Sequence, residues 1–386
     1  MPLIIDDIEI KIVPNDIDKF IDYHVYLKER SLYIINQVLI GNNSSVKTFY
    51  SSNFITYVHQ REYAIIDSDY SKTKIIGSDE ATTCHIVLIK NRNTSILCLV
   101  HIDNEYGIKA WLLNVVKGMI ELSNYDNNIQ TFDIWLYCGY KDEGNVSQKI
   151  SLAVLDALIN FSYPNKTVEF ILQCLCTGSI NTRYMNPPIE LSTNSSYNED
   201  KITHIVKDTI PLPIITGMAY QLSYPYKKKY YSSVNKAMKD FFNPFPALFE
   251  DKGPDYLLRS ARNFVSYNEC ATEDIKYYKY FDITDIPKYF TKSEKNFTDY
   301  LHFDFHLCKI HNGDKLSNLT DSMILHNFST SPLAESKNFV PRLRKMFKLL
   351  QIRHDTKGKE GSIPENFIKH ANTYKMDNHT GEWLLV

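Results

Sequence analysis

The sequence lacks three features that would each define a class of protein. No uninterrupted apolar run approaches the roughly 18 residues that a membrane helix needs. No block of five like charges occurs, and the 386 residues carry a formal net charge of only −2, which argues against nucleic acid as a partner. The start, MPLIIDDIEIK, places two aspartates where a signal peptide has its positive and apolar regions. We therefore expect a soluble protein that is not secreted and that binds neither nucleic acid nor membranes.

Cysteine is also scarce. The seven cysteines are too few for this length, and odd in number, to form a disulfide framework. Reduced thiols in the cytosol or the nucleus fit this composition best. The chain has no P-loop, no dinucleotide-binding glycine turn and no G-x-S-x-G elbow, so these motifs give no lead to function.

Short runs of β-branched and aromatic residues predict strands in the first half of the chain. These runs are at 55–66, 73–77, 84–90, 95–102, 132–138 and 168–176. Apolar residues at three- and four-residue steps predict two helices, at 108–120 and 147–160. The alternation of strands and helices is typical of an α/β fold.

The second half continues this pattern with interruptions. Strands are predicted at 212–222 and 245–249, and helices at 254–263 and 339–351. Because no repeat and no convincing linker separates the halves, we expect a single α/β (α+β) domain over residues 1–386. Three polar stretches without apolar stripes look like surface insertions. They are at 183–203, 223–243 and 271–298.

The most informative local feature is the hairpin predicted within residues 84–102. If its loop is centred on Arg92 and Asn93, residues equidistant from that centre pair, and Cys84 faces His101. The Cβ atoms of such partners lie about 4.5–5.5 Å apart, so the imidazole can activate the thiol and later protonate a leaving group. The hairpin thus predicts a catalytic pair. A buried cysteine without any chemical role, or a loop slipped by one residue, is the alternative.

The turn before this hairpin carries further polar groups. Residues 76–84 read IGSDEATTC, which combines a glycine able to take a positive φ, small hydroxyl side chains and two carboxylates. Such a turn can direct backbone N–H groups at a developing oxyanion and place a hydroxyl beside an imidazole. A plain polar connection between two strands is the alternative interpretation.

Five strings in this order resemble the protein N-terminal asparagine amidohydrolase family, together with the opening MPL. They are YVHQREYAII, IGSDEATTCHIVLI, NVSQKI, FEDKGPDYLLRSAR and HNFSTSPLAESKNFV. The resemblance extends from about residue 54 to 350. It implies a cytosolic or nuclear enzyme that hydrolyses the side-chain amide of an N-terminal asparagine to aspartate and ammonia. The new acidic terminus can then be arginylated and read by the N-degron pathway.

The resemblance also implies a fold and a set of catalytic residues. The fold is the α-β-β sandwich of cysteine hydrolases that include bacterial glutamine deamidases and deamidating toxins, which use a Cys-His-Ser/Thr triad. In this sequence Cys84 is the implied nucleophile and His101 the implied base. Ser78 is our choice for the third member, and Thr82 and Thr83 compete with it. No metal or cofactor is implied.

Specificity for a chain terminus requires a group that pairs with the α-ammonium. The candidates are Asp79, Glu80 and Glu335. Helix capping around Pro332 is the alternative role for the string that contains Glu335. Hydroxyl side chains that can meet the amide or the peptide backbone are Thr83, Ser329, Thr330 and Ser331.

Two other patterns have chemical interpretations. His302, Asp304 and His306 alternate and can bind zinc, but a half-buried strand or a substrate-side role explains the same alternation. Cys174 and Cys176 share one strand face and lack the spacing of redox pairs, so we expect core thiols.

Two other function classes share the same residues. An inactive reader of N-terminal residues would keep the fold and lose turnover, and a cysteine peptidase would release a new amine terminus. We expect a monomer whose partners are proteins or peptides with a free N-terminal asparagine, and an arginyl-transferase is a candidate partner.

Overall fold

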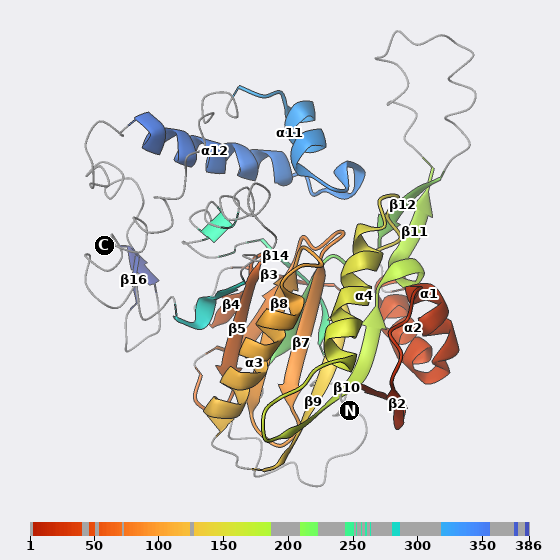
Figure 1. Ribbon diagram of the computed structural model, residues 1–386. Coiled ribbons are helices and arrows are strands. Elements are labelled where there is room, and N and C mark those ends of the chain that lie inside the picture. The colour runs from red at the N-terminus through yellow and green to blue at the C-terminus, as the bar shows by residue number, and fades with distance from the viewer. Residues whose placement is uncertain are drawn as a thin grey trace.

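Most of the predicted strands belong to two β-sheets (Figure 1). The larger sheet has the strand order β15-β5-β8-β7-β9-β10-β1-β2 in the described part of the chain. The computed structural model describes residues 3–40, 46–50, 54–71, 73–123, 127–186, 209–222, 244–250, 252, 256, 259–260, 263, 280–285, 318–355, 374–376 and 383–385.

The central strands of the larger sheet are apolar on both faces. Every residue of β8 is buried, as are all but one of β7, which is typical of a sheet covered on both sides. The strands are β15 (Phe281–Asp282), β5 (Glu62–Asp67), β8 (Ile96–Ile102), β7 (His85–Asn91), β9 (Ile129–Tyr137), β10 (Thr167–Cys176), β1 (Leu3–Ile5) and β2 (Ile8–Ile10).

Helices cover one face of this sheet (Figure 1). The predicted apolar stripe of α3 (Ile108–Ser123) is buried from Ile108 to Ile120 and packs on β5 and β8. The second predicted helix is α4 (Val146–Ile159), whose first N–H groups bond to the Asp142 carboxylate. Two further helices, which the sequence did not indicate, pack against β10 and α4. They are α1 (Ile17–Tyr23) and α2 (Val25–Ile40).

The smaller sheet covers the opposite face, with the order β3-β14-β13-β6-β4 (Figure 1). Ile76, Met218 and Tyr220 of this sheet share one hydrophobic core with β7 and β8. Gly77 is required here by close packing, because an added Cβ would lie 2.3 Å from Phe249 Cζ. The strands are β3 (Lys47–Phe49), β14 (Phe245–Phe249), β13 (Met218–Gln221), β6 (Ile75–Ser78) and β4 (Ile55–Tyr57).

The glycine in the IGSDEATTC turn therefore has a different role from the one expected. Positive φ in this turn falls on Glu80, at 58°, and not on Gly77. The glycine serves to let β6 approach β13 and β14, since Met218 O would also lie 2.7 Å from an added Cβ.

Two predicted strands are each divided between two sheets. Residues 55–66 split into β4 and β5, because the chain turns at Arg61, which has a φ of 62°. Residues 212–222 split into β12 (Ile210–Pro213), which pairs with β11 (Thr182–Met185), and β13 of the smaller sheet. A continuous apolar run does not reveal such a crossing, because both halves consist of strand-forming apolar residues.

The predicted insertions are described only at their edges. Residues 183–185 belong to β11. At 280–285 the prediction of a surface insertion is wrong, because Tyr280 and Ile283 are buried and β15 extends the larger sheet beside β5. The other parts lie outside the described residues: 187–203, 223–243, 271–279 and 286–298.

Helices α11 (Asp321–Phe328) and α12 (Phe339–Asp355) lie at the end of the sheets where β7 begins and β8 ends (Figure 1). The predicted last helix is α12 (Phe339–Asp355), and the predicted 254–263 helix is helical at its described residues, 256, 259, 260 and 263. Among the described helices, none is both long and apolar enough to cross a membrane. The remaining elements are η1 (Gly178–Asn181), η6 (Ile283–Asp285), α11 (Asp321–Phe328), η7 (Pro332–Ala334), β16 (Tyr374–Met376) and β17 (Trp383–Leu385).

Candidate active site

The β7–β8 hairpin differs from its predicted register by two residues. Ile86, and not Cys84, lies opposite His101, and Cys84 directly precedes β7. The loop begins later than expected because Asn91 remains in the strand and its side chain accepts the N–H of Asn93 at 2.9 Å. A shift of two residues keeps side chains on the same face, so Cys84 still lies on the His101 side of the sheet.

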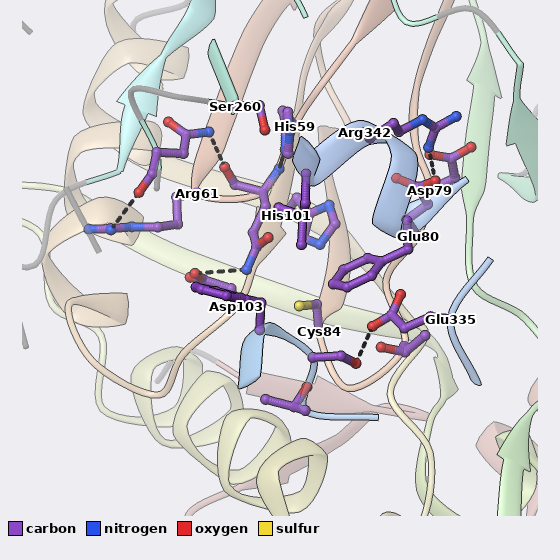
Figure 2. A pocket seen from close by; sticks show the side chains of 18 of the residues that line it. His59, Arg61, Asp79, Glu80, Cys84, His101, Asp103, Ser260, Glu335 and Arg342 are labelled. Carbon is purple, nitrogen blue, oxygen red and sulfur yellow. Dashed lines mark hydrogen bonds and ion pairs between the residues drawn. The ribbon is translucent and has the colours of Figure 1, made fainter. Parts of the chain in front are cut away.

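A thiol, an imidazole and a hydroxyl meet at this end of the two sheets. Ser78 Oγ at the end of β6 lies 2.8 Å from His101 Nδ1 on β8, and both side chains are buried. Within the described part of the chain, the buried His101 Nε2 has no hydrogen-bond partner. Cys84 and His101 line the same cavity, of about 380 Å³ (Figure 2).

The other two hydroxyls of the turn have different partners. Thr82 Oγ1 accepts the hydroxyl of Ser331 at 2.6 Å, and Thr83 Oγ1 lies 2.7 Å from Thr330 Oγ1. Among the hydroxyls of Ser78, Thr82 and Thr83, only that of Ser78 therefore forms a hydrogen bond with the His101 imidazole.

The protonation states of the pair follow from burial. Burial raises the pKa of the Cys84 thiol well above its usual value, and the charges of Asp103 and Glu335 raise it further. Burial also lowers the pKa of His101 to about 3, with a further contribution from the Lys252 ammonium. At neutral pH the resting pair is thus a thiol and a neutral imidazole.

Ser329, Thr330 and Glu335, which are far from the hairpin in sequence, line one side of the cavity. The hydrogen bonds of Thr330 and Ser331 attach this segment to the turn before Cys84. Ser331 is the N-cap of η7, but its side chain makes no capping bond. Ser331 therefore does not cap this helix through its side chain, in contrast to the alternative role considered for the string.

The two carboxylates of the turn have cationic partners. Asp79 accepts from the Lys252 ammonium at 2.6 Å and from the Phe249 N–H at 2.5 Å. Glu80 bonds to the same ammonium at 2.6 Å and to the Arg342 guanidinium (Figure 2). These contacts attach β14 and α12 to the turn, which is a structural role.

Replacing Asp79 with asparagine is expected to lower the free energy of unfolding by about 3 kcal/mol, since Lys252 is buried and loses a charged acceptor. Chemical denaturation measures this loss. The matched control is Asp156→Asn, which removes the exposed ion pair with Lys109 and should cost less than about 1 kcal/mol. Equal costs for the two variants would contradict a structural role for Asp79.

Glu335 and Asp103 are the other carboxylates on the cavity wall. Glu335 accepts the Ser329 hydroxyl at 2.5 Å, and burial raises the pKa of its carboxyl to about 7. Asp103 accepts the Gln60 amide at 3.1 Å (Figure 2). Neither Asp103 nor Gln60 was predicted as a site residue. Two features of the sequence could have indicated them: Gln60 lies in the string YVHQREYAII, and Asp103 lies two residues after His101, on the same side of the strand.

The remaining sequence patterns give no second site among the described residues. Cys174 and Cys176 are buried in the core, as predicted, with their sulfur atoms 3.2 Å apart. The alternating histidines and aspartate at 302–306 lie outside the described residues. In the part of the chain that the structure describes, no group of three or more potential ligands can hold a metal ion.

Cys84 and His101 line one cavity, and Ser78 hydrogen-bonds to His101 beside it. Cysteine-dependent hydrolases use the same three kinds of group. Comparison with known families narrows this class. The family model "Protein N-terminal asparagine amidohydrolase" matches residues 45–225 and 242–384. The chain belongs to this family, and the resemblance found in the sequence is confirmed.

Relatives from animals and plants carry the same name. The human protein N-terminal asparagine amidohydrolase is 25% identical over 356 residues, which cover 91% of this chain and 89% of the relative. The mouse protein is 25% identical over 99% of this chain and 97% of its own length. The Arabidopsis thaliana protein is 24% identical over 75% of this chain and 71% of its own length.

Proposed function

We propose that this protein hydrolyses the side-chain amide of an N-terminal asparagine, giving aspartate and ammonia. Membership of the family supports the substrate class. The observation that carries the chemistry is the hydrogen bond between Ser78 Oγ and His101 Nδ1, beside the cavity that Cys84 and His101 line. When Nδ1 donates its proton to the hydroxyl, Nε2 is the nitrogen that can accept a proton, and it has no partner within the described residues. The helices on one face of the larger sheet and the smaller sheet on the other support the α-β-β sandwich of deamidating cysteine hydrolases.

The first half of the proposed reaction forms a thioester. As the Cys84 sulfur bonds to the carboxamide carbon, the thiol proton moves to His101 Nε2. Backbone N–H groups of Cys84 and a neighbouring residue stabilise the oxyanion. The C–N bond then breaks, and His101 gives its proton to the departing nitrogen, which leaves as ammonia.

The second half hydrolyses the thioester. His101, neutral again, takes a proton from water as the water oxygen bonds to the carbonyl carbon. The C–S bond breaks, the Cys84 sulfur recovers a proton and the product carries a carboxylate. The lowered pKa of His101 keeps the imidazole neutral, and so able to accept a proton, before each attack.

Replacing Ser78 with alanine is expected to lower kcat by about 10- to 100-fold with little change in KM, because His101 Nδ1 loses the partner that fixes its tautomer and orientation. Steady-state kinetics on an asparagine peptide measure this. Ser151→Ala is the matched control, since Ser151 Oγ lies 2.6 Å from another buried imidazole, that of His85. Equal losses of kcat in both variants would contradict a specific role for Ser78.

The activity is tested with peptides that begin with Asn, Gln or acetyl-Asn. Hydrolysis of the amide releases ammonia and raises the peptide mass by about 1 Da. Turnover of the Asn peptide alone supports the proposed function. Binding without turnover would instead indicate a reader of N-terminal residues, and a new amine terminus would indicate a peptidase.

The reaction suggests a cellular role. An N-terminal aspartate is a substrate for arginylation, so the product would enter the N-degron pathway. We propose action as a monomer in the cytosol or the nucleus, with an arginyl-transferase as a candidate partner.

A further inference from the structure

Lys252 is a buried cation that bonds to two carboxylates at once. Its side chain is 2% exposed, and its ammonium lies 2.6 Å from Asp79 Oδ1 and 2.6 Å from Glu80 Oε2. The ammonium also lies over the rings of Tyr57 and Tyr256, 5.0 and 5.3 Å from their centroids. A buried charge is unfavourable unless it is paired, so the ammonium and the two carboxylates depend on one another.

The shape of the turn explains how two successive residues reach one ammonium. Along an extended strand, the side chains of Asp79 and Glu80 would point to opposite faces. Glu80 instead has a φ of 58°, in the left-handed region, and this local turn lets both carboxylates face Lys252. Such a conformation is unfavourable for a non-glycine residue and persists only where its surroundings hold it. The shared ammonium is one contact that holds it, and the Arg342 guanidinium is another.

The same turn carries both groups that the proposed reaction brings to His101. Ser78 immediately precedes Asp79, and Cys84 follows Glu80 by four residues. The conformation of the turn therefore determines how the chain leaves β6 and enters β7. A change in it would move the Cys84 thiol relative to Ser78, and so relative to the imidazole to which Ser78 bonds.

We propose that Lys252 is a positioning residue of the reaction: its ammonium joins the Asp79 and Glu80 carboxylates and so fixes the turn that sets the thiol against the imidazole. This inference rests on the proposed function, because the groups it positions belong to that reaction. In the described part of the chain, the cavity wall includes Asp79 and Glu80 but not Lys252, so the ammonium acts through the turn. After burial, its charge is the second cause of the lowered pKa of His101, so the cation also lies near the base.

Replacing Lys252 with methionine is expected to lower kcat on an asparagine peptide by about 10- to 100-fold, while KM stays within about threefold of the wild-type value. The released turn misplaces the thiol, but the cavity keeps the residues that meet the peptide. Lys252→Arg retains a cation able to bond to two carboxylates, and should restore kcat to within about threefold of wild type. Steady-state kinetics under conditions where each variant is folded measure these values.

Two further variants separate this effect from a general loss of stability. Ile35 is buried in α2 and does not line the cavity, so Ile35→Ala should reduce stability while leaving kcat within about twofold of wild type. Glu80→Ala breaks one of the two bonds and leaves Lys252 paired with Asp79, so this variant should fold even if Lys252→Met does not. We expect it to lower kcat by about tenfold.

Amide hydrogen exchange tests the turn without turnover. The Ala81 N–H donates to Thr216 O at 2.9 Å, which protects an amide within the turn. Relative to the amides of β8, we expect its exchange to be at least about tenfold faster in Lys252→Met and in Glu80→Ala, and unchanged within about threefold in Ile35→Ala.

The inference is overturned if the Ala81 amide exchanges no faster in Lys252→Met and Glu80→Ala, if Ile35→Ala lowers kcat as much as these variants do, or if Lys252→Arg recovers no activity. Failure of the proposed function is separate, because it shows as no ammonia release from the wild-type protein. The exchange measurement does not depend on turnover, and in that case it still decides whether Lys252 fixes the turn.

Discussion

Replacing Cys84 with alanine is expected to lower kcat/KM on an asparagine peptide by at least about 10⁴-fold, which corresponds to about 5.5 kcal/mol of transition-state stabilisation. Without the sulfur atom no thioester forms, and the remaining groups can only assist direct attack by water. The fold should be unchanged, because the side chain is only partly buried at the cavity. Ammonia release, with circular dichroism to check folding, measures both effects.

Cys98→Ala is the matched control for this variant. Cys98 is fully buried in β8 between the two layers that cover the sheet, so its loss should reduce stability while leaving turnover within about tenfold of the wild-type value. A Cys84→Ala protein that keeps more than about 1% of the wild-type rate would rule out Cys84 as the nucleophile.

Replacing His101 with asparagine is expected to lower kcat by about 10³- to 10⁴-fold. The reason is the protonation of the resting pair. Because the Cys84 thiol has a raised pKa, it cannot ionise by itself at neutral pH, and the imidazole must accept its proton during the attack. In the wild-type protein the pKa of His101 is about 3, so the imidazole stays neutral near pH 6.5. We therefore expect no fall in activity near pH 6.5 from protonation of His101.

His85→Gln is the control for this prediction. His85 is also buried with its pKa lowered to about 3, but its Nε2 bonds to Ser151 and Thr177. We expect His85→Gln to reduce stability, which thermal unfolding measures, and to keep kcat within about tenfold of the wild-type value, which steady-state kinetics measure. If both histidine variants fold and lose kcat equally, the assignment of His101 as the base is wrong.

The sequence predicted the face of the Cys84–His101 hairpin but not its register. The alternation of side chains along a strand specifies which residues share a face. A shift of the strand pairing by two residues leaves each side chain on the same face. The register depends on where the loop begins, and that was decided by the side chain of Asn91, which accepts the N–H of Asn93. A local hydrogen bond of this kind is not visible in an apolar pattern.

Other parts of the site depended on contacts between distant segments. Spacing could not choose among the hydroxyls of Ser78, Thr82 and Thr83, because the packing of the smaller sheet on the larger one decides which of them meets His101. Only the family resemblance indicated that residues 329–335 belong to the site, since no local pattern links them to the hairpin. Their contacts with the turn span about 250 residues of sequence.

The hydrogen bond between Ser78 and His101 joins two different sheets. Ser78 ends β6 of the smaller sheet and His101 lies on β8 of the larger one. On the proposed function, the smaller sheet therefore positions the base as well as covering the core. Misplacement by about 1 Å can cost about 100-fold in rate. A change in the spacing of these two layers is therefore expected to slow the proposed reaction even if each sheet stays intact.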